Sequence, residues 1–79
     1  MSQSIYEYFK KELDEATVFV RIDPNTFAGL ELIVLKNNQI KKTVRTFDET
    51  IYTELEFDKF VKGNPIEFNL FLKGVPNHK

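Results

Sequence analysis

The chain has 79 residues, of which 42% are hydrophobic and 29% are charged, and its formal net charge is −1. This composition argues against a disordered chain, and the near-zero net charge gives no general attraction to nucleic acid or to a membrane surface. The sequence contains no cysteine, which excludes a disulfide and a thiolate nucleophile. We therefore expect a single small globular domain covering residues 1–79.

Residues 4–15 are predicted to form an N-terminal helix. Ser4 followed by Glu7 has the spacing of a capping box, in which each side chain bonds the backbone amide of the other residue. An apolar residue also recurs at every fourth position and forms one stripe: Ile5, Phe9 and Leu13. The segment has neither the basic start nor the apolar run of a signal peptide, so we expect a cytoplasmic protein without a membrane partner.

Three strands are predicted next, over 16–23, 29–36 and 40–47. Apolar and polar side chains alternate in the first and third, whereas the middle strand is apolar on both sides, as expected for a strand covered on both faces. The stretches DPNT (23–26) and NNQ (37–39) have the composition of tight turns. These features predict a three-stranded antiparallel β-meander.

The last third of the chain contains the near-repeat EFDKFVKG (56–63) and EFNLFLKG (67–74). Each copy spaces its apolar residues as a helix does and ends in Lys-Gly, which is typical of a helix C-terminus. We therefore predict two short C-terminal helices joined by a sharp corner at Gly63-Asn64. A short extended segment over 50–53 is expected to precede the first of them, which covers about 54–62.

Capping residues support both C-terminal helices. Thr53 and Glu56 have capping-box spacing before the first helix. Before the second, Asn64 is a preferred cap and Pro65 suits the first helical position. Residues 66–72 also alternate as a strand would, and a strand remains the alternative there. Taken together, these elements predict an α+β domain.

Residues with catalytic or metal-binding chemistry are scarce. The single histidine, His78, is one residue from the C-terminus, and the serines are Ser2 and Ser4, so no Ser/His pair is formed and zinc lacks its usual ligands. We therefore predict a non-enzymatic protein without a catalytic residue, cofactor or metal. Five acids crowd one segment: Asp48, Glu49, Glu54, Glu56 and Asp58. Their spacing does not match a calcium loop, and a solvated acidic face is the interpretation preferred.

The sheet suggests a protein-binding surface. We expect the helices to cover the face formed by Val18, Val20, Ile22, Leu30, Leu32, Val34, Ile40 and Val44. The opposite face would then carry five residues predicted to form an interface: Phe19, Arg21, Ile33, Leu35 and Arg45. An exposed apolar patch rimmed by charge is typical of a partner surface. The predicted function is a small protein–protein interaction module, with a homodimer as one form; the alternative is that a C-terminal helix covers this face and makes it core.

A second functional hypothesis concerns the hairpin 36–45, which carries cations and no acid. Its basic residues are a candidate site for nucleic acid or another anionic ligand: Lys36, Lys41, Lys42 and Arg45. No aromatic residue is interleaved with them, and lysine is also a common guard of edge strands. The hypothesis is therefore the alternative to a protein partner.

Overall fold

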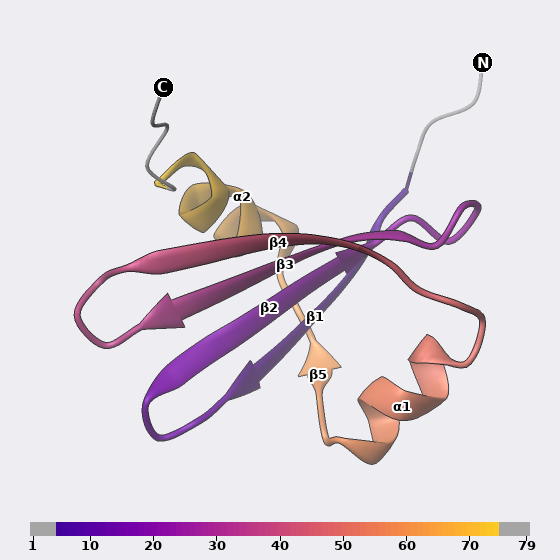
Figure 1. The fold of residues 1–79 in the computed structure, drawn as a ribbon, viewed down its shortest axis with the longest axis horizontal. Coiled ribbons are helices and arrows are strands. Elements are labelled where there is room, and N and C mark those ends of the chain that lie inside the picture. The colour runs from indigo at the N-terminus through magenta and orange to yellow at the C-terminus, as the bar shows by residue number, and fades with distance from the viewer. Residues whose placement is uncertain (1–4, 75–79) are drawn as a thin grey trace.

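The computed structural model describes residues 5–74. Within this range the chain forms four strands, a helix, a short fifth strand and a second helix. Figure 1 shows four strands side by side before the first helix. The elements in chain order are β1 (Glu7–Glu12), β2 (Ala16–Ile22), β3 (Ala28–Leu35), β4 (Ile40–Thr46), α1 (Ile51–Phe57), β5 (Val61–Lys62) and α2 (Pro65–Lys73).

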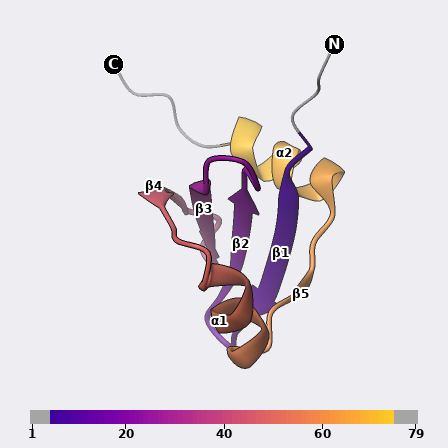
Figure 2. The same cartoon turned by 90° about the vertical axis from the view of Figure 1, so that its right-hand side faces the viewer.

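The strands form one antiparallel sheet in the order β4-β3-β2-β1-β5. The chain runs through three successive hairpins from β1 to β4, and after α1 it returns to the opposite edge of the sheet, where the two residues of β5 pair with Phe9 and Lys10 of β1. Figure 2 shows α1 and α2 at opposite ends of the molecule, connected by β5 along the edge of β1.

Each helix packs on a different face of the sheet. On the α2 side the buried residues are Phe19, Leu30, Leu32 and Phe68. Phe68 of α2 lies edge-on to Tyr8, with ring centroids 5.4 Å apart, and Phe71 stacks on Phe19 at 5.1 Å. On the α1 side the buried residues are Val20, Ile22, Ile51 and Leu55. Because successive side chains of a strand point to opposite faces, Phe19 and Val20 belong to different cores.

The α1 side gains space from a glycine on β3. Gly29 has no side chain, and the ring of Phe47 occupies the space where its Cβ would stand. Phe27 of the β2–β3 turn and Tyr52 of α1 complete this side with ring centroids 6.2 Å apart. The apolar residues on both sides of β2 and β3 are thus explained by a helix on each face.

The predicted N-terminal helix is wrong, because Glu7–Glu12 is a strand that pairs along its whole length with β2. A spacing of four residues, as in Ile5, Phe9 and Leu13, fits one face of a helix and equally one face of a strand, whose period is two. Pairing with β2 supplies the backbone hydrogen bonds of this segment, and its neighbour β5 covers part of the other edge. Ser4, the first residue of the predicted capping box, lies outside the described residues.

The three-stranded meander is also wrong as a description of the sheet, which has five strands. The three predicted strands themselves are present as β2, β3 and β4. The α+β class with an antiparallel sheet is confirmed.

The predicted division of the sheet into two faces is wrong as well. Phe19 is paired with Leu32, and Val18 is paired with Ile33. Directly paired residues of antiparallel strands lie on the same face. Phe19 therefore shares the α2 side with Leu32, and Ile33 lies on the α1 side with Val18.

Of the two predicted C-terminal helices, only the second is correct. Helix α1 begins at Ile51, inside the segment expected to be extended, and ends at Phe57, so that most of the first predicted helix is a turn and β5. The second helix begins at Pro65, and the Asn64 side chain accepts hydrogen bonds from the amides of Ile66 and Glu67. That cap is the predicted one, and the helix interpretation of 66–72 is confirmed.

Candidate functional site

One half of the α1 side is not covered by a helix. Ile33 and Leu35 of β3 are part-buried and belong to neither buried cluster. They lie beside Val18 and Ala16, their partners on β2. We call these four residues, Ala16, Val18, Ile33 and Leu35, the open half-face. Helix α1 packs instead at the Val20 and Ile22 end of the same face.

The residues predicted to form an interface are divided between the two faces. Ile33 and Leu35 lie on the α1 side, and Arg45 joins them because it pairs with Gly29 and forms a 3.7 Å salt bridge to Glu31. Phe19 is on the other side and 1% exposed, beneath α2. Arg21 is on that side too, with its guanidinium carbon 4.3 Å from the centroid of the Tyr6 ring. The structure therefore brings three of the five residues to one face.

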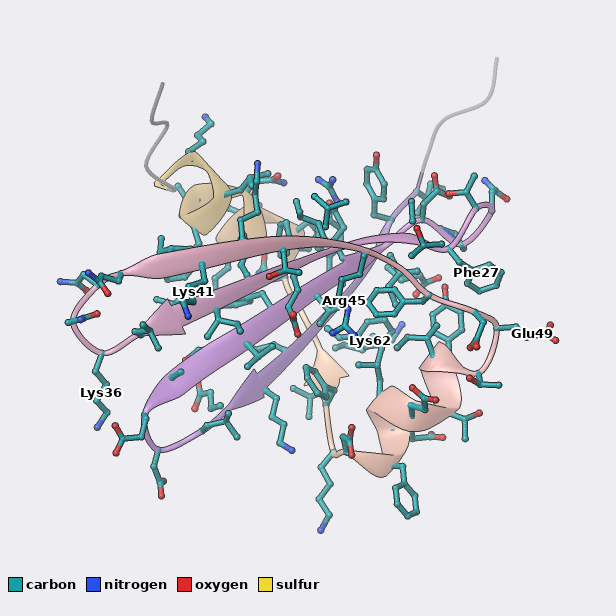
Figure 3. All side chains as sticks on the ribbon, in the orientation of Figure 1. Phe27, Lys36, Lys41, Arg45, Glu49 and Lys62 are labelled. Carbon is teal, nitrogen blue, oxygen red and sulfur yellow. The ribbon has the colours of Figure 1, made fainter. Side chains whose placement is uncertain are left out.

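The cations predicted to bind an anion do not converge on one site. Strand β4 alternates, so Lys41 and Arg45 point to the α1 side and Lys42 points to the α2 side. Lys36 lies in the turn between β3 and β4, and Figure 3 shows it with Lys41 at the end of the sheet away from α1.

Helix α1 presents an acidic surface and one large apolar side chain to solvent. Glu54 and Glu56 are exposed, and its last turn carries no base. Phe57 is 86% exposed, whereas Leu55 is 5% exposed. A helix rotates by about 100° per residue, so Phe57 points away from the sheet that Leu55 contacts. The sequence carries this signal, because Ile51 and Leu55 face almost opposite to Phe57 on a helix.

The acidic segment before and within α1 does not form a metal site. Within residues 5–74 no three acidic or histidine side chains lie close enough together to hold a metal ion. The Asp48 carboxylate accepts hydrogen bonds from the Thr50 hydroxyl and the Thr50 amide, and these bonds lower the pKa of Asp48. Asp48 therefore acts in the turn that starts α1. His78 lies outside the described residues.

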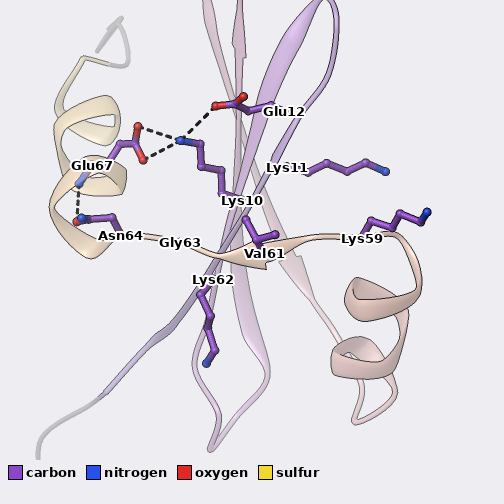
Figure 4. Close-up of a pocket in the computed structure, with 9 residues that line it drawn as sticks. All are labelled: Lys10, Lys11, Glu12, Lys59, Val61, Lys62, Gly63, Asn64 and Glu67. Atoms are coloured by element: carbon purple, nitrogen blue, oxygen red, sulfur yellow. Dashed lines mark hydrogen bonds and ion pairs between the residues drawn. The ribbon is translucent and has the colours of Figure 1, made fainter.

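A lysine-lined cleft forms where β1, β5 and the start of α2 meet. It has a volume of about 710 Å³ and is shown in Figure 4. We call it the lysine cleft, after four of its nine lining residues: Lys10, Lys11, Lys59 and Lys62. They come from β1, from the turn after α1 and from β5, which only the pairing of β5 with β1 brings together. No pattern in the sequence indicates this pairing, because the residues of β5 have the apolar spacing of a helix.

Lys10 connects α2 to the sheet within this cleft. Its Nζ lies 3.3 Å from both carboxylate oxygens of Glu67 and 3.4 Å from Glu12. Partial burial opposes the charged form of Lys10, but the hydrogen bonds and charges of Glu67 and Glu12 outweigh it and raise the pKa of Lys10. The positive charge of Lys10 is therefore already paired with carboxylates of the protein itself.

One further polar group is buried near a smaller cleft of about 540 Å³ lined by Phe9, Tyr52 and Phe60, among others. The Tyr52 hydroxyl has no hydrogen-bond partner among the described residues. Burial, and then the charges of Glu7 and Asp23, raise the pKa of this hydroxyl. A phenol that is held neutral in an aromatic cluster does not supply a base or a nucleophile.

Comparison with known proteins does not identify the chain: no family model, curated protein or solved structure matches it. Within residues 5–74, neither helix has the length and apolar character that crossing a bilayer requires. Two surfaces of the molecule are candidates for binding: the open half-face with α1 beside it, and the lysine cleft.

Proposed function

We propose that this chain is a small non-enzymatic protein–protein interaction module that forms a homodimer through the α1 side of its sheet. The observation that carries the proposal is the pairing, on one face, of an uncovered apolar area with a helix that exposes a large apolar side chain. Three residues of the open half-face, Ala16, Ile33 and Leu35, lie outside the cluster on which α1 packs, and Phe57 of α1 is 86% exposed.

The two halves of this face are arranged at opposite ends of the sheet, which suits a two-fold contact. Helix α1 projects at one end, and the open half-face lies at the other (Figures 1 and 3). A two-fold axis that lies between the two copies, parallel to their sheets and at right angles to the line from α1 to the open half-face, would place the α1 helix of each copy over the open half-face of its partner. The interface would then be closed and self-complementary. The seven residues of α1 span roughly 10 Å at 1.5 Å per residue, which matches two to three strand residues at about 3.3 Å each.

The charges of the two halves are complementary as well. Lys41 stands on the α1 side next to Ile33, its partner on β3. Glu54 and Glu56 are exposed on α1. The two-fold arrangement brings these opposite charges together at the rim, where they set orientation and selectivity more than affinity.

The energetics of such a dimer are reasonable for a chain of this size. Burying a phenylalanine side chain stabilises by roughly 1.5–3 kcal/mol, and the symmetric interface buries Phe57 twice. A standard interface covers about 800 Å² on each partner, or roughly an eighth of the 5989 Å² surface of this chain.

The first test is the mass of the protein in solution, measured by light scattering and sedimentation for wild type and three variants. We expect a dimer for wild type, a monomer for Phe57→Asp and for Leu35→Asp, and a dimer for the control Val44→Asp. Val44 is 76% exposed but lies on the α2 side. A monomeric wild type refutes the homodimer, and a dimer that survives both Phe57→Asp and Leu35→Asp refutes the choice of face.

A charge exchange tests the orientation. Lys41→Glu and Glu56→Lys should each weaken the dimer, and the double variant should restore it, because the rim pair is then present with its charges reversed. If the loss of dimer affinity in the double variant equals the sum of the losses in the two single variants, the two side chains do not meet.

Anion or nucleic-acid binding by Lys36, Lys41, Lys42 and Arg45 is supported less well than a protein partner. These cations are divided between two faces and a turn, and Arg45 is already paired with Glu31. Such an arrangement offers a diffuse positive charge rather than a site.

A further inference from the structure

The lysine cleft has more positive charge than its own carboxylates neutralise. Its lining residues include four lysines against two glutamates, Glu12 and Glu67, so two positive charges remain in excess. Lys10 is the lysine that these glutamates hold. The three other lysines form no salt bridge with either of these glutamates.

Lys11 and Lys59 are the cations available to a ligand. Among residues 5–74 neither forms an ion pair. Lys62 is 3.4 Å from Glu7 and its side chain is 80% exposed, a solvated pair that contributes little. In Figure 4, Lys11 and Lys59 extend toward the same side of β5, whereas Lys62 extends to the other side.

The backbone conformation of Lys59 is strained for a residue that has a side chain. Lys59 has a φ of 67°, in the left-handed region that favours glycine. Its amide donates to the Glu56 carbonyl and the amide of Phe60 donates to the Leu55 carbonyl, so the turn after α1 is fixed. Lys59 therefore keeps its side chain at a backbone position that glycine would occupy with less strain.

We propose that the lysine cleft binds a small phosphate monoester as its dianion, with Lys11 and Lys59 contacting the phosphate. A phosphate monoester carries about −1.5 to −2 charges at pH 7, and Lys11 and Lys59 together supply two positive charges. Lys10 is a positioning residue: it points to the α2 side, opposite to Lys11, and its contact with Glu67 holds α2 against β1. This inference does not require the proposed dimer, because the cleft lies at the β5 edge of the sheet. Lys11 nevertheless stands beside the open half-face, since it pairs with Val18.

The cleft has the dimensions of a small-molecule site. Its volume of about 710 Å³ is within the roughly 300–1,000 Å³ range of ligand pockets. The start of α2 contributes no free amide here, since Pro65 has no N–H and the Ile66 and Glu67 amides bond to Asn64. Binding therefore depends on the lysine ammonium groups, and it should weaken as ionic strength rises.

The experiment is a titration of the isotopically labelled protein with O-phosphoserine, followed by amide chemical shifts at low ionic strength. We expect saturable shifts at residues 10–12 and 59–63. Lys11→Gln should weaken binding about tenfold, as should Lys59→Gly, because each removes one charge-assisted contact. Lys36→Gln and Lys42→Gln are matched controls on the basic hairpin and should leave the affinity unchanged.

The state of charge provides a second readout. Below the second pKa of the phosphate, about 6, O-phosphoserine becomes a monoanion, and its affinity should fall. Serine itself, the matched probe without phosphate, should not bind at either pH. The proposal is overturned if O-phosphoserine gives no saturable shifts at millimolar concentration, if serine shifts the same amides, or if the hairpin variants abolish binding while Lys11→Gln and Lys59→Gly do not.

Discussion

The two copies of the near-repeat, 56–63 and 67–74, adopt different structures despite their similar letters. The second copy is almost wholly helix α2. The first copy contains the last two residues of α1, a turn and strand β5. At equivalent places in the two copies, Phe57 is 86% exposed and Phe68 is 1% exposed.

The difference lies in what precedes and what surrounds each copy. Asn64 and Pro65 start a new helix directly before the second copy, whereas the first copy follows a helix that has already begun at Ile51. The first copy also reaches the free edge of β1, where two of its residues find strand partners. An apolar spacing of three and four residues therefore permits a helix without requiring one.

The largest expected effect separates the two phenylalanines. Phe68→Ala removes a ring from the α2-side core and should cost about 3–5 kcal/mol of unfolding free energy. Phe57→Ala should cost less than about 0.5 kcal/mol in dilute solution, where dimer formation does not contribute. Urea denaturation measures both. If Phe68→Ala is too unstable to study, Phe68→Leu keeps the order, and equal costs at the two positions would contradict it.

The two terminal glycines form the next matched pair. A Cβ on Gly63 would lie 3.1 Å from the backbone nitrogen of Phe9, because β5 approaches β1 closely there. Gly63→Ala should therefore cost about 1–3 kcal/mol. A Cβ on Gly74 would meet nothing closer than 3.5 Å, and its φ of −81° suits alanine. Gly74→Ala should be neutral or stabilising by about 0.4–1 kcal/mol. Thermal unfolding measures both variants. A Gly63→Ala variant at least as stable as Gly74→Ala would contradict the close approach of β5 to β1.

The caps before the two copies should differ as well. Asn64 accepts hydrogen bonds from two amides of α2, and Asn64→Ala should cost about 1 kcal/mol. Thr53, which precedes the first copy by the same interval, lies inside α1, so the predicted capping box at Thr53 is wrong. Thr53→Ala should be neutral or stabilise by roughly 0.5 kcal/mol. A loss of stability at Thr53 like that at Asn64 would indicate a cap there after all.

The smallest effect concerns Lys59 and its counterpart Leu70. Lys59→Gly should stabilise by roughly 0.5 kcal/mol, because relief of the left-handed backbone exceeds the entropy gained by the unfolded chain. Leu70 is 64% exposed inside α2, and Leu70→Gly should destabilise by about 1 kcal/mol. Lys59→Gly is also expected to lose phosphate affinity. A gain in stability together with a loss of binding would support both the backbone strain at Lys59 and its contact with the phosphate.

The sequence predicted those elements whose signals are local. Alternation located β2, β3 and β4 within about a residue, and the Asn64-Pro65 cap located α2. It predicted part of one candidate surface, since Ile33, Leu35 and Arg45 share a face. It missed the lysine cleft, whose cations come from two stretches far apart in the chain, 10–11 and 59–62.

What the sequence by itself determined is therefore the set of strands and helices marked by caps, turns and alternation. Tertiary structure alone decided that Glu7–Glu12 is a strand, that Val61 and Lys62 join it, and which helix covers which face. The physical reason is that a four-residue apolar spacing satisfies both a helix and a strand, while backbone pairing with a distant segment selects between them. The register of β2 against β3 then buried Phe19 and left Ile33 beside the open half-face, because a shift of one residue exchanges the two faces of a sheet.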